Sequence, residues 1–333
     1  MKMLFGAVPL AALALTASAW PPVENPDDVA AGSRIAFTRL REDVNRPGSD
    51  FRLDAEIWVM NGDGSQPRRL THNTTDDLAA VWSPDGRTIA FHGAQWSRPD
   101  PSGPLVAGPP HLFLVDVDSG VQTPLLTDQG EPVRGRFPSW SPNGQKIAFD
   151  TGGQGSHVFV INLDGSGLEQ LTGSTALPNI RPDWSPDGRK IAFASGPNQQ
   201  QQIYVMNADG SDPVRLTDSN SDGNAVAPDW SPNGHRIVFQ SNRDSTEEAR
   251  NDEIYVMNAD GSDQRRLTNY PGQDVDADWS PDGRMIAFQR DSEPRQINQL
   301  FVVRVDGGEP MPLTALPSAN GHPAWSRGHA AEP

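Results

Sequence analysis

The chain has 333 residues, no cysteine and a formal net charge of −16, with 43 acidic against 27 basic side chains. Without cysteine no disulfide can hold the fold together, so stability must come from a buried core, for which the chain is long enough. A surface this acidic repels phosphate backbones and anionic lipid headgroups, which argues against nucleic acid or membrane surfaces as partners. The 31 prolines and 31 glycines leave little room for long helices.

Residues 1–19 have the three parts of a secretory signal peptide. Lys2 precedes the apolar stretch 4–15, and the small residues Ala17-Ser18-Ala19 follow it. The stretch is shorter than the roughly 20 apolar residues that cross a bilayer, so membrane insertion is not expected. We therefore predict an exported protein, periplasmic or extracellular, that begins with a short extension at 20–32 once the signal peptide is removed.

One sequence unit recurs along the rest of the chain. An apolar run such as Ile203–Met206 is followed by a Gly-containing turn and a Leu-Thr pair, which is Leu126-Thr127 in the unit that opens at Trp82. Runs this short, rich in β-branched and aromatic residues and bounded by Pro and Gly, are typical of strands, so each unit predicts four strands. The opening segment, Trp-Ser-Pro-Asp/Asn-Gly and then Ile-Ala/Val-Phe, starts at intervals of 44 to 58 residues, at Trp82, Trp140, Trp184, Trp230 and Trp279.

The two ends of the repeat region are incomplete and complement each other. Ile35–Phe37, Ile57–Met60 and Leu70-Thr71 are the second to fourth strands of a unit that lacks its first, and Ala324–Ser326 is a lone first strand. Joined, they make a sixth unit and remove the open sheet edges. The sequence therefore predicts an all-β fold, a six-bladed β-propeller of four-stranded antiparallel blades over 33–326, with the ring closed by strands from both termini.

The repeated unit resembles that of the TolB propeller and its WD-repeat-like relatives. The residues that carry the likeness are Trp-Ser-Pro-Asp-Gly, Ile-Ala-Phe, Ile-Tyr-Val-Met-Asn-Ala-Asp-Gly-Ser and Arg-Leu-Thr, in that order. The likeness covers 33–326, with only the extension at 20–32 and a tail at 327–333 beside it. It implies a protein that works outside the cytoplasm and uses its propeller to bind another envelope protein. TolB proteins also carry an α/β domain ahead of the propeller, which we expect this chain to lack because the extension leaves no room for it.

One face of such a propeller should collect the variable segments. The loops between second and third strands share this face with the crossings between blades, and they include the long segments 38–56, 92–111 and 240–253. Variable loops on a rigid scaffold are the usual place for binding, so we predict that a monomer binds an envelope or extracellular protein or peptide here. Trp96, in the second of these loops, is a predicted anchor for the partner. The other predicted binding residues precede each tryptophan and should line the channel mouth; they are Asp76, Asp77, Arg134, Arg136, Asn179, Arg181, Asn224, Asp274, Asp276, Asn320 and His322.

Three carboxylates, Asp183, Asp229 and Asp278, stand directly before their tryptophans. One interpretation is that they pair with buried backbone donors between the blades. The other is a structural calcium ion in the channel, because carboxylate oxygens are ligands that calcium prefers. No other cofactor is expected.

Catalysis is not expected from the motifs that the chain offers. The sequence has no cysteine and no Gly-x-Ser-x-Gly segment, and Ser83 recurs in every unit as a turn residue. The histidines show none of the spacings that metal-binding histidines have. The alternative to a non-catalytic binding protein is a propeller enzyme, either a calcium-assisted hydrolase or a sugar-acid lyase, that acts at the channel mouth.

Overall fold

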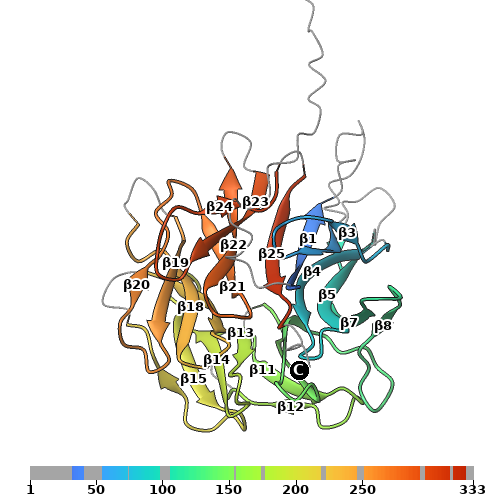
Figure 1. Ribbon diagram of the computed structural model, residues 1–333. Helices are drawn as coiled ribbons and strands as arrows, with labels where there is room; N and C mark the ends of the chain where they lie inside the picture. Colours follow the sequence, from blue (N-terminus) through green and yellow to red (C-terminus); the bar gives the residue numbers. More distant parts are fainter. Residues whose placement is uncertain are drawn as a thin grey trace, which may run out of the picture.

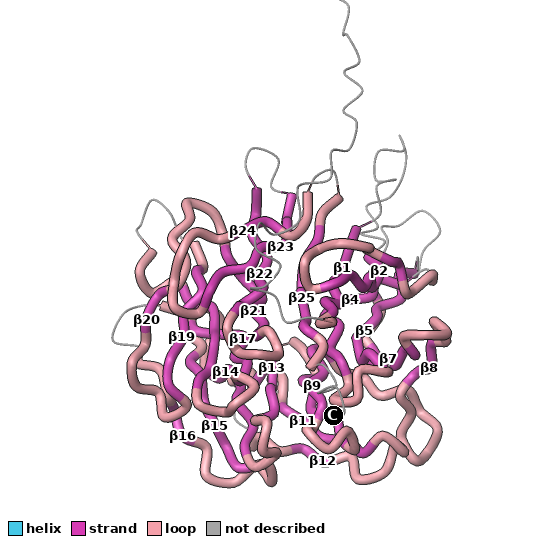
Figure 2. Tube along the Cα trace, viewed as in Figure 1, coloured by secondary structure: helices cyan, strands magenta, loops and turns pink. Residues whose placement is uncertain are grey.

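The computed structural model describes residues 32–40, 55–73, 75–97, 106–153, 155–173, 177–218, 223–245, 251–292, 297–315 and 318–327. The predicted signal peptide lies outside these residues, as do nearly all of the extension and of the tail. Every regular element in the described ranges is a strand, as Figure 2 shows. None of these ranges holds a helix of the length and apolar character that crossing a bilayer requires.

The strands form six sheets around a central axis, here called blades 1 to 6 (Figure 1). Five sheets have four strands each, and the sheet of blade 2 has a fifth, β6 (Val106–Ala107), paired with β5. Blade 1 consists of β25 (Asn320–Trp325), β1 (Arg34–Leu40), β2 (Ala55–Asn61) and β3 (Arg68–Arg69). Blade 2 consists of β4 (Thr75–Trp82), β5 (Thr88–Ser97), β7 (His111–Asp116) and β8 (Gln122–Pro124). Blade 3 consists of β9 (Arg136–Trp140), β10 (Lys146–Asp150), β11 (Val158–Asn162) and β12 (Glu169–Gln170).

The remaining blades repeat the same order, and all neighbouring strands within a blade are antiparallel. Blade 4 consists of β13 (Asn179–Trp184), β14 (Lys190–Ser195), β15 (Gln202–Asn207) and β16 (Val214–Arg215). Blade 5 consists of β17 (Ala225–Trp230), β18 (Arg236–Ser241), β19 (Glu253–Asn258) and β20 (Arg265–Arg266). Blade 6 consists of β21 (Asp274–Trp279), β22 (Met285–Ser292), β23 (Ile297–Arg304) and β24 (Met311–Pro312).

Strands from the two ends of the chain close the ring. In Figure 1 the blue β1 lies beside the red β25, and the two pair antiparallel with Ile35 opposite Trp325. At the end of this ladder the amide of Ser326 donates to the carbonyl of Arg34 at 2.7 Å, and the hydroxyl of Ser326 accepts from the amide of Arg34 at 2.9 Å. The predicted six-bladed propeller, with its ring closed by both termini, is therefore confirmed.

Aromatic side chains build the core within the blades and between them. A phenylalanine on the second strand stacks on the aromatic residue opposite it on the third strand, as Phe91 does on Phe113 with ring centroids 5.5 Å apart. The tryptophan that opens each unit packs between blades, so that Trp82 of blade 2 shares a buried cluster with Val59 and Leu70 of blade 1. Since each sheet is covered on both faces by neighbouring blades, its inner strands are apolar on both sides.

The Leu-Thr pair fixes the outer strand of five blades. The threonine hydroxyl accepts a backbone amide of the third strand, as Thr71 does from Ile57 at 2.9 Å. The prediction that Leu126-Thr127 is the pair of blade 2 is wrong, because Leu125 is the buried residue there and Leu126 is 39% exposed. In blade 2 the amide of Leu112 has no threonine hydroxyl to bond to. It donates instead to the carbonyl of Val133, in a short hairpin, at 2.9 Å.

Candidate binding site at the channel mouth

A β-bulge interrupts the innermost strand of every blade, three residues before its tryptophan. At this position the backbone adopts φ between +48° and +54°, which an L-residue does at a cost of about 1 kcal/mol or more. The pairing register between first and second strands shifts across the bulge in all six blades. Bulges re-aim side chains, and here they turn one side chain per blade into the channel. We call these six residues the channel ring; in blade order from 1 to 6 they are His322, Ala79, Phe137, Arg181, Ala227 and Asp276.

The channel has two layers. The channel ring lines a cavity of about 130 Å³, together with the residues that stand directly before the tryptophans. A second hollow on the other side of these pre-tryptophan residues is lined by Pro84 of a Ser-Pro-Asp-Gly turn and by Arg327, but by no residue of the ring. The ring therefore lies toward the face with the loops and crossings, at the channel mouth.

Three charged or titratable side chains of the ring contact one another. The guanidinium of Arg181 forms an ion pair with Oδ1 of Asp276, and Nε2 of His322 lies 3.4 Å from Oδ2 of the same carboxylate. Burial opposes the charge of Asp276, but Arg181 and His322 hold the pKa of its carboxyl below the ordinary value. Burial lowers the pKa of His322, and Asp276 partly offsets this. The Asp276 carboxyl therefore stays ionised, and it contacts both Arg181 and His322.

An aromatic side chain completes this half of the ring. Arg181 lies over Phe137, with its Cζ 3.9 Å from the ring centroid, and His92 meets the same phenylalanine edge-on with centroids 5.2 Å apart. The Nδ1 atom of His92 accepts the amide of Phe137 at 3.4 Å. Burial, helped by the positive charges of His322, Arg136 and Arg181, lowers the pKa of His92 to about 3. A neutral histidine therefore fixes the bulge at Phe137.

The three carboxylates of the inner layer link neighbouring blades. Each accepts the backbone N–H of the tryptophan in the following blade, at 2.8 Å from Trp230 to Asp183, 3.0 Å from Trp279 to Asp229 and 2.6 Å from Trp325 to Asp278. Burial raises the pKa of all three, to about 7 for Asp278, and the charges of Asp278 and Asp183 raise that of Asp229 further. Within the described ranges no three or more His, Asp or Glu side chains converge as a metal site would require.

The predicted binding residues fall into three groups. Arg181, Asp276 and His322 belong to the channel ring, and Arg136 lies beside it, with its Cζ 5.4 Å from the centroid of Phe137. Four others stand five residues before a tryptophan and are buried within their blades: Asp77, Asn179, Asp274 and Asn320.

The partners of these four residues are internal. Asp77 accepts Asn73 and Thr75, and burial raises its pKa to about 6. Two hydrogen bonds of 2.7 Å join the Asp274 carboxylate to Arg290. The Oδ1 of Asn320 accepts Arg39 at 2.7 Å, and the Nδ2 of Asn179 donates to the carbonyl of Leu177 at 3.1 Å. Asp274 and Asn320 thus bind the neighbouring strand of their own blade, whereas Asp77 and Asn179 bind residues just before them in the chain.

The last four predicted residues also lie apart from the ring. Asp76 accepts the amide of Ala55 at 3.2 Å, and Asn224 accepts the amide of Gln201 at 2.9 Å. Arg134 is exposed and forms a backbone bridge with His111. The backbone of Trp96 belongs to β5 and pairs with Ala107 of β6, and its side chain lies outside the description.

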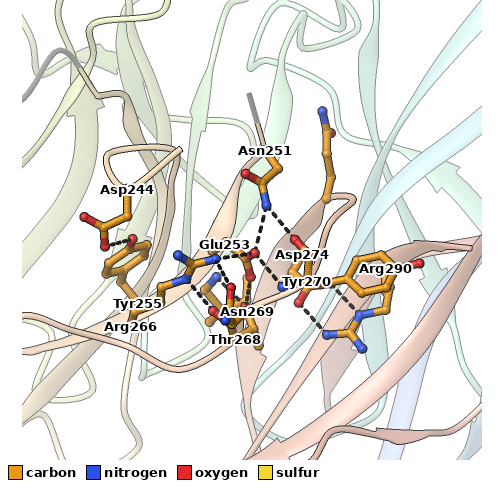
Figure 3. A network of polar contacts seen from close by, with 12 residues as sticks. Asp244, Asn251, Glu253, Tyr255, Arg266, Thr268, Asn269, Tyr270, Asp274 and Arg290 are labelled. Carbon is orange, nitrogen blue, oxygen red and sulfur yellow. Dashed lines mark hydrogen bonds and ion pairs between the residues drawn. The ribbon is translucent and has the colours of Figure 1, made fainter. Parts of the chain in front are cut away.

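Figure 3 shows a network of polar contacts on the loop side of blades 5 and 6. Glu253, which is 2% exposed, accepts hydrogen bonds from Thr268 at 2.6 Å, from Arg266 at 2.6 Å and from the amide of Tyr270 at 2.7 Å. Blade 1 repeats the arrangement with its own glutamate, arginine and threonine, which are Glu56, Arg69 and Thr71. These networks brace the loops around the mouth.

Sequence reasoning missed half of the channel ring. Phe137, Ala79 and Ala227 were not among the predicted residues, because the prediction selected polar side chains near each tryptophan. The available signal was positional: all six ring residues stand at one fixed offset from a repeated tryptophan. The bulge turns the side chain at this position into the channel, and no single residue type marks the bulge in this chain.

A closed ring of six four-stranded blades, each turning one side chain into a central channel, defines a six-bladed β-propeller with a candidate binding site at its mouth. The chain belongs to the TolB beta propeller domain family, whose model matches residues 105–221 and again residues 218–330. The resemblance inferred from the repeat is therefore confirmed.

Individual relatives match parts of the molecule. The TolB homolog of Chlorobium luteolum is 38% identical over 166 residues, which are 50% of this chain and 35% of that protein. TolB from Acinetobacter baumannii superposes with a TM-score of 0.68 at 20% identity, covering 88% of this chain and 66% of the other. An oligogalacturonate lyase from Vibrio parahaemolyticus superposes with a TM-score of 0.52 at 14% identity, covering 78% of this chain and 71% of the other. The chain spans about a third of the length of its curated relative, and the two structural matches show a shared fold alone.

Proposed function

We propose that this protein is exported and binds, without catalysis, a segment of an envelope or extracellular protein through the channel ring. The observation that carries the proposal is the contact group of Phe137, Arg181, Asp276 and His322, which four of the six strained bulges hold in place at the channel mouth. Side chains fixed before binding lose little conformational freedom when a partner arrives, so such a group favours recognition.

The size of the cavity supports a peptide rather than a small molecule as the ligand. About 130 Å³ is below the roughly 300–1,000 Å³ of ordinary small-molecule pockets, and it suits one or two inserted side chains. The ring offers an aromatic face at Phe137, carboxylate oxygens at Asp276 and guanidinium donors at Arg181. These groups complement the amides and an apolar side chain of an extended segment.

Export is supported by two observations. The pattern of residues 1–19 is that of a signal peptide, and proteins named TolB or TolB homolog are similar to this chain in sequence and in fold. Binding of an envelope protein is what the family resemblance implies for the loop-rich face.

The experiment compares baits that differ only at the ring. The purified protein, a Phe137→Ala variant and an Asp276→Ala/His322→Ala variant are immobilised and exposed to an envelope extract of the source organism after mild cross-linking. Asp164→Ala, in an exposed turn on the opposite face, is the matched control. We expect a set of proteins that the original chain and the control retain and both ring variants lose. Identical captures by all four baits would contradict the proposal.

A propeller enzyme is the second candidate, because His92, His322 and Asp276 gather at the ring and an oligogalacturonate lyase shares the fold. The assay is incubation with oligogalacturonate, with and without calcium or manganese, followed by ultraviolet absorbance of an unsaturated product. A rate that His322→Ala abolishes would favour the lyase. Unchanged absorbance under all these conditions would leave the binding function as the better account.

A further inference from the structure

A larger hollow lies on the opposite face, in the seam between blades 4 and 5, which are neighbours in Figure 2. It encloses about 640 Å³, within the size range of ligand pockets. Blade 4 contributes Val205, Val214 and Leu216 as an apolar wall, and blade 5 contributes Trp230. Val214 is 58% exposed. We call this hollow the seam groove.

The corresponding seam between blades 1 and 2 is filled by two arginines. Arg34 lies over Trp82, with its Cζ 4.5 Å from the ring centroid, and donates to the carbonyl of Gly86 at 2.9 Å. Arg68 donates to the carbonyl of Val117 at 2.9 Å. Both guanidinium groups thus come from blade 1 and bind backbone carbonyls of blade 2.

Strand register shows which residues take these places in blade 4. Arg68 stands opposite Val59 on the fourth strand of blade 1, and Val214 stands opposite Val205 in the same way. Arg34 pairs with an asparagine at the end of the third strand, as Lys190 does. The amine of Lys190 donates to Asn207 at 2.9 Å instead of crossing to the next blade.

Blade 5 nevertheless has the same aromatic and carbonyl groups that the arginines contact in blade 2. Trp230 and Gly234 are the blade 5 counterparts of Trp82 and Gly86, and Ala259 is the counterpart of Val117, by their matching backbone hydrogen bonds. Trp230, Gly234 and Ala259 all line the seam groove. The seam between blades 5 and 6 again uses an arginine, because Arg265 donates to the carbonyl of Val305. The seam groove therefore presents the same kinds of group that bind arginine at the seam between blades 1 and 2, with Val214 and Lys190 at the positions of Arg68 and Arg34.

We infer that the seam groove binds an arginine side chain of an extended segment of a partner polypeptide. The guanidinium lies over Trp230 and donates to the carbonyls of Gly234 and Ala259, while its methylene groups pack on Val214 and Leu216. A planar guanidinium stacks on an indole and satisfies several acceptors at once, which an ammonium group does less well.

Two carboxylates and one ammonium group, that of Lys190, line the groove, so the balance of charge at its rim is negative and agrees with a cationic occupant. Asp187 of blade 4 and Asp260 of blade 5 both line it, and hydrogen bonds from Ser185 and Ser262 hold the pKa of these carboxyls below the ordinary value. The chain as a whole carries a formal charge of −16, which attracts basic partners from a distance. The groove and the channel ring lie on opposite faces, so this site is separate from the proposed function.

The test is a titration of the purified full chain, labelled with ¹⁵N in its tryptophans, with the peptide acetyl-Gly-Arg-Gly-amide. The neutral citrulline counterpart of the peptide is the matched ligand. We expect the indole N–H resonance of Trp230, which Trp230→Phe assigns, to move when the arginine peptide is added. At equal peptide concentration, the change in its chemical shift should be at least about tenfold larger with the arginine peptide than with the citrulline peptide. Absence of a shift at about 10 mM peptide, or equal shifts with both ligands, would overturn the proposal.

Two variants show whether the effect belongs to the seam groove. Val214→Arg supplies the missing arginine from the chain itself and should abolish the shift, while Val121→Arg introduces the same charge at a valine of similar exposure, 59%, in blade 2 and should preserve it. The tryptophan spectra also report whether each variant is folded. A shift that persists in Val214→Arg would contradict the site, and Phe137→Ala should leave the titration unchanged because it alters only the channel ring.

Discussion

Arg181 of blade 4 reaches Asp276 of blade 6 across the whole of blade 5, whose ring residue is Ala227. On the other side of the channel, Phe137 of blade 3 and His322 of blade 1 approach to 6.4 Å between centroids across blade 2, whose ring residue is Ala79. Two alanines at opposite points of the ring therefore allow the four larger side chains to meet. These contacts join blades that share no sheet and no seam.

Replacing Asp276 by Asn should lower the free energy of unfolding by about 1–2 kcal/mol, because the ion pair is only partly exposed at the mouth. The pKa of Asp276 is lowered in the folded chain, so its contribution is present above the ordinary carboxyl pKa and is lost as pH falls. Urea denaturation should show the difference at pH 6 and little of it at pH 3. Asp306→Asn, which removes an exposed carboxylate beside Arg304, is the control and should leave the free energy of unfolding unchanged at both pH values.

Replacing Asp278 by Asn should stabilise the protein at alkaline pH relative to the original chain. The amide keeps an acceptor for the N–H of Trp325 but removes a carboxyl whose pKa burial raises to about 7. A raised pKa means that the stability contribution is complete at low pH and is lost as pH rises through about 7. Melting temperatures at pH 5 and pH 8 measure this. A calcium-dependent rise in the melting temperature of the original chain, absent from Asp278→Asn, would instead support the calcium interpretation.

The repeat made most of the fold predictable. Trp82 and its counterparts mark each blade, and the lone strand ending at Trp325 can only complete the unit that begins at Ile35, so blade number and ring closure followed from counting. The exception was blade 2, where Leu125 and Leu126 are chemically equivalent. Only the hairpin that brings Val133 onto the third strand decides between them.

The candidate site was less predictable because a backbone feature defines it. Asp274 and Asp276 are two residues apart on one strand, yet Asp274 binds Arg290 inside blade 6 and Asp276 enters the channel. In a regular strand both would face the same side. The bulge between Val275 and Asp278 changes this, and bulges leave no consistent residue signature when Ala, Phe, Arg, Asp and His all occupy the position.

Ring closure can be tested at two adjacent residues of the C-terminal end, Trp325 and Ser326. Trp325→Ala removes a side chain that is 3% exposed in the cluster shared by blades 1 and 6, and should cost about 3–5 kcal/mol. Ser326→Ala removes only the hydroxyl that accepts the amide of Arg34 and should cost about 1 kcal/mol. Urea unfolding of the original chain and of both variants measures the two losses in the free energy of unfolding. Equal and small losses would mean that the two ends of the chain contribute little to the stability of the ring.

Replacing His92 by Gln should remove part of the acid sensitivity of the protein. Burial lowers the pKa of His92 to about 3, whereas an unfolded histidine titrates near 6.5. A lowered histidine pKa means that stability is present above about 6.5 and is lost as pH falls, because the unfolded chain gains a proton that the folded chain refuses. Between pH 7 and pH 5 the original chain should therefore lose about 2 kcal/mol more than His92→Gln. Urea unfolding at the two pH values measures the difference, and a ¹⁵N spectrum should show an unprotonated Nδ1 at pH 5. Parallel losses in both proteins would mean that His92 is charged in the fold and that its contact with the amide of Phe137 does not persist.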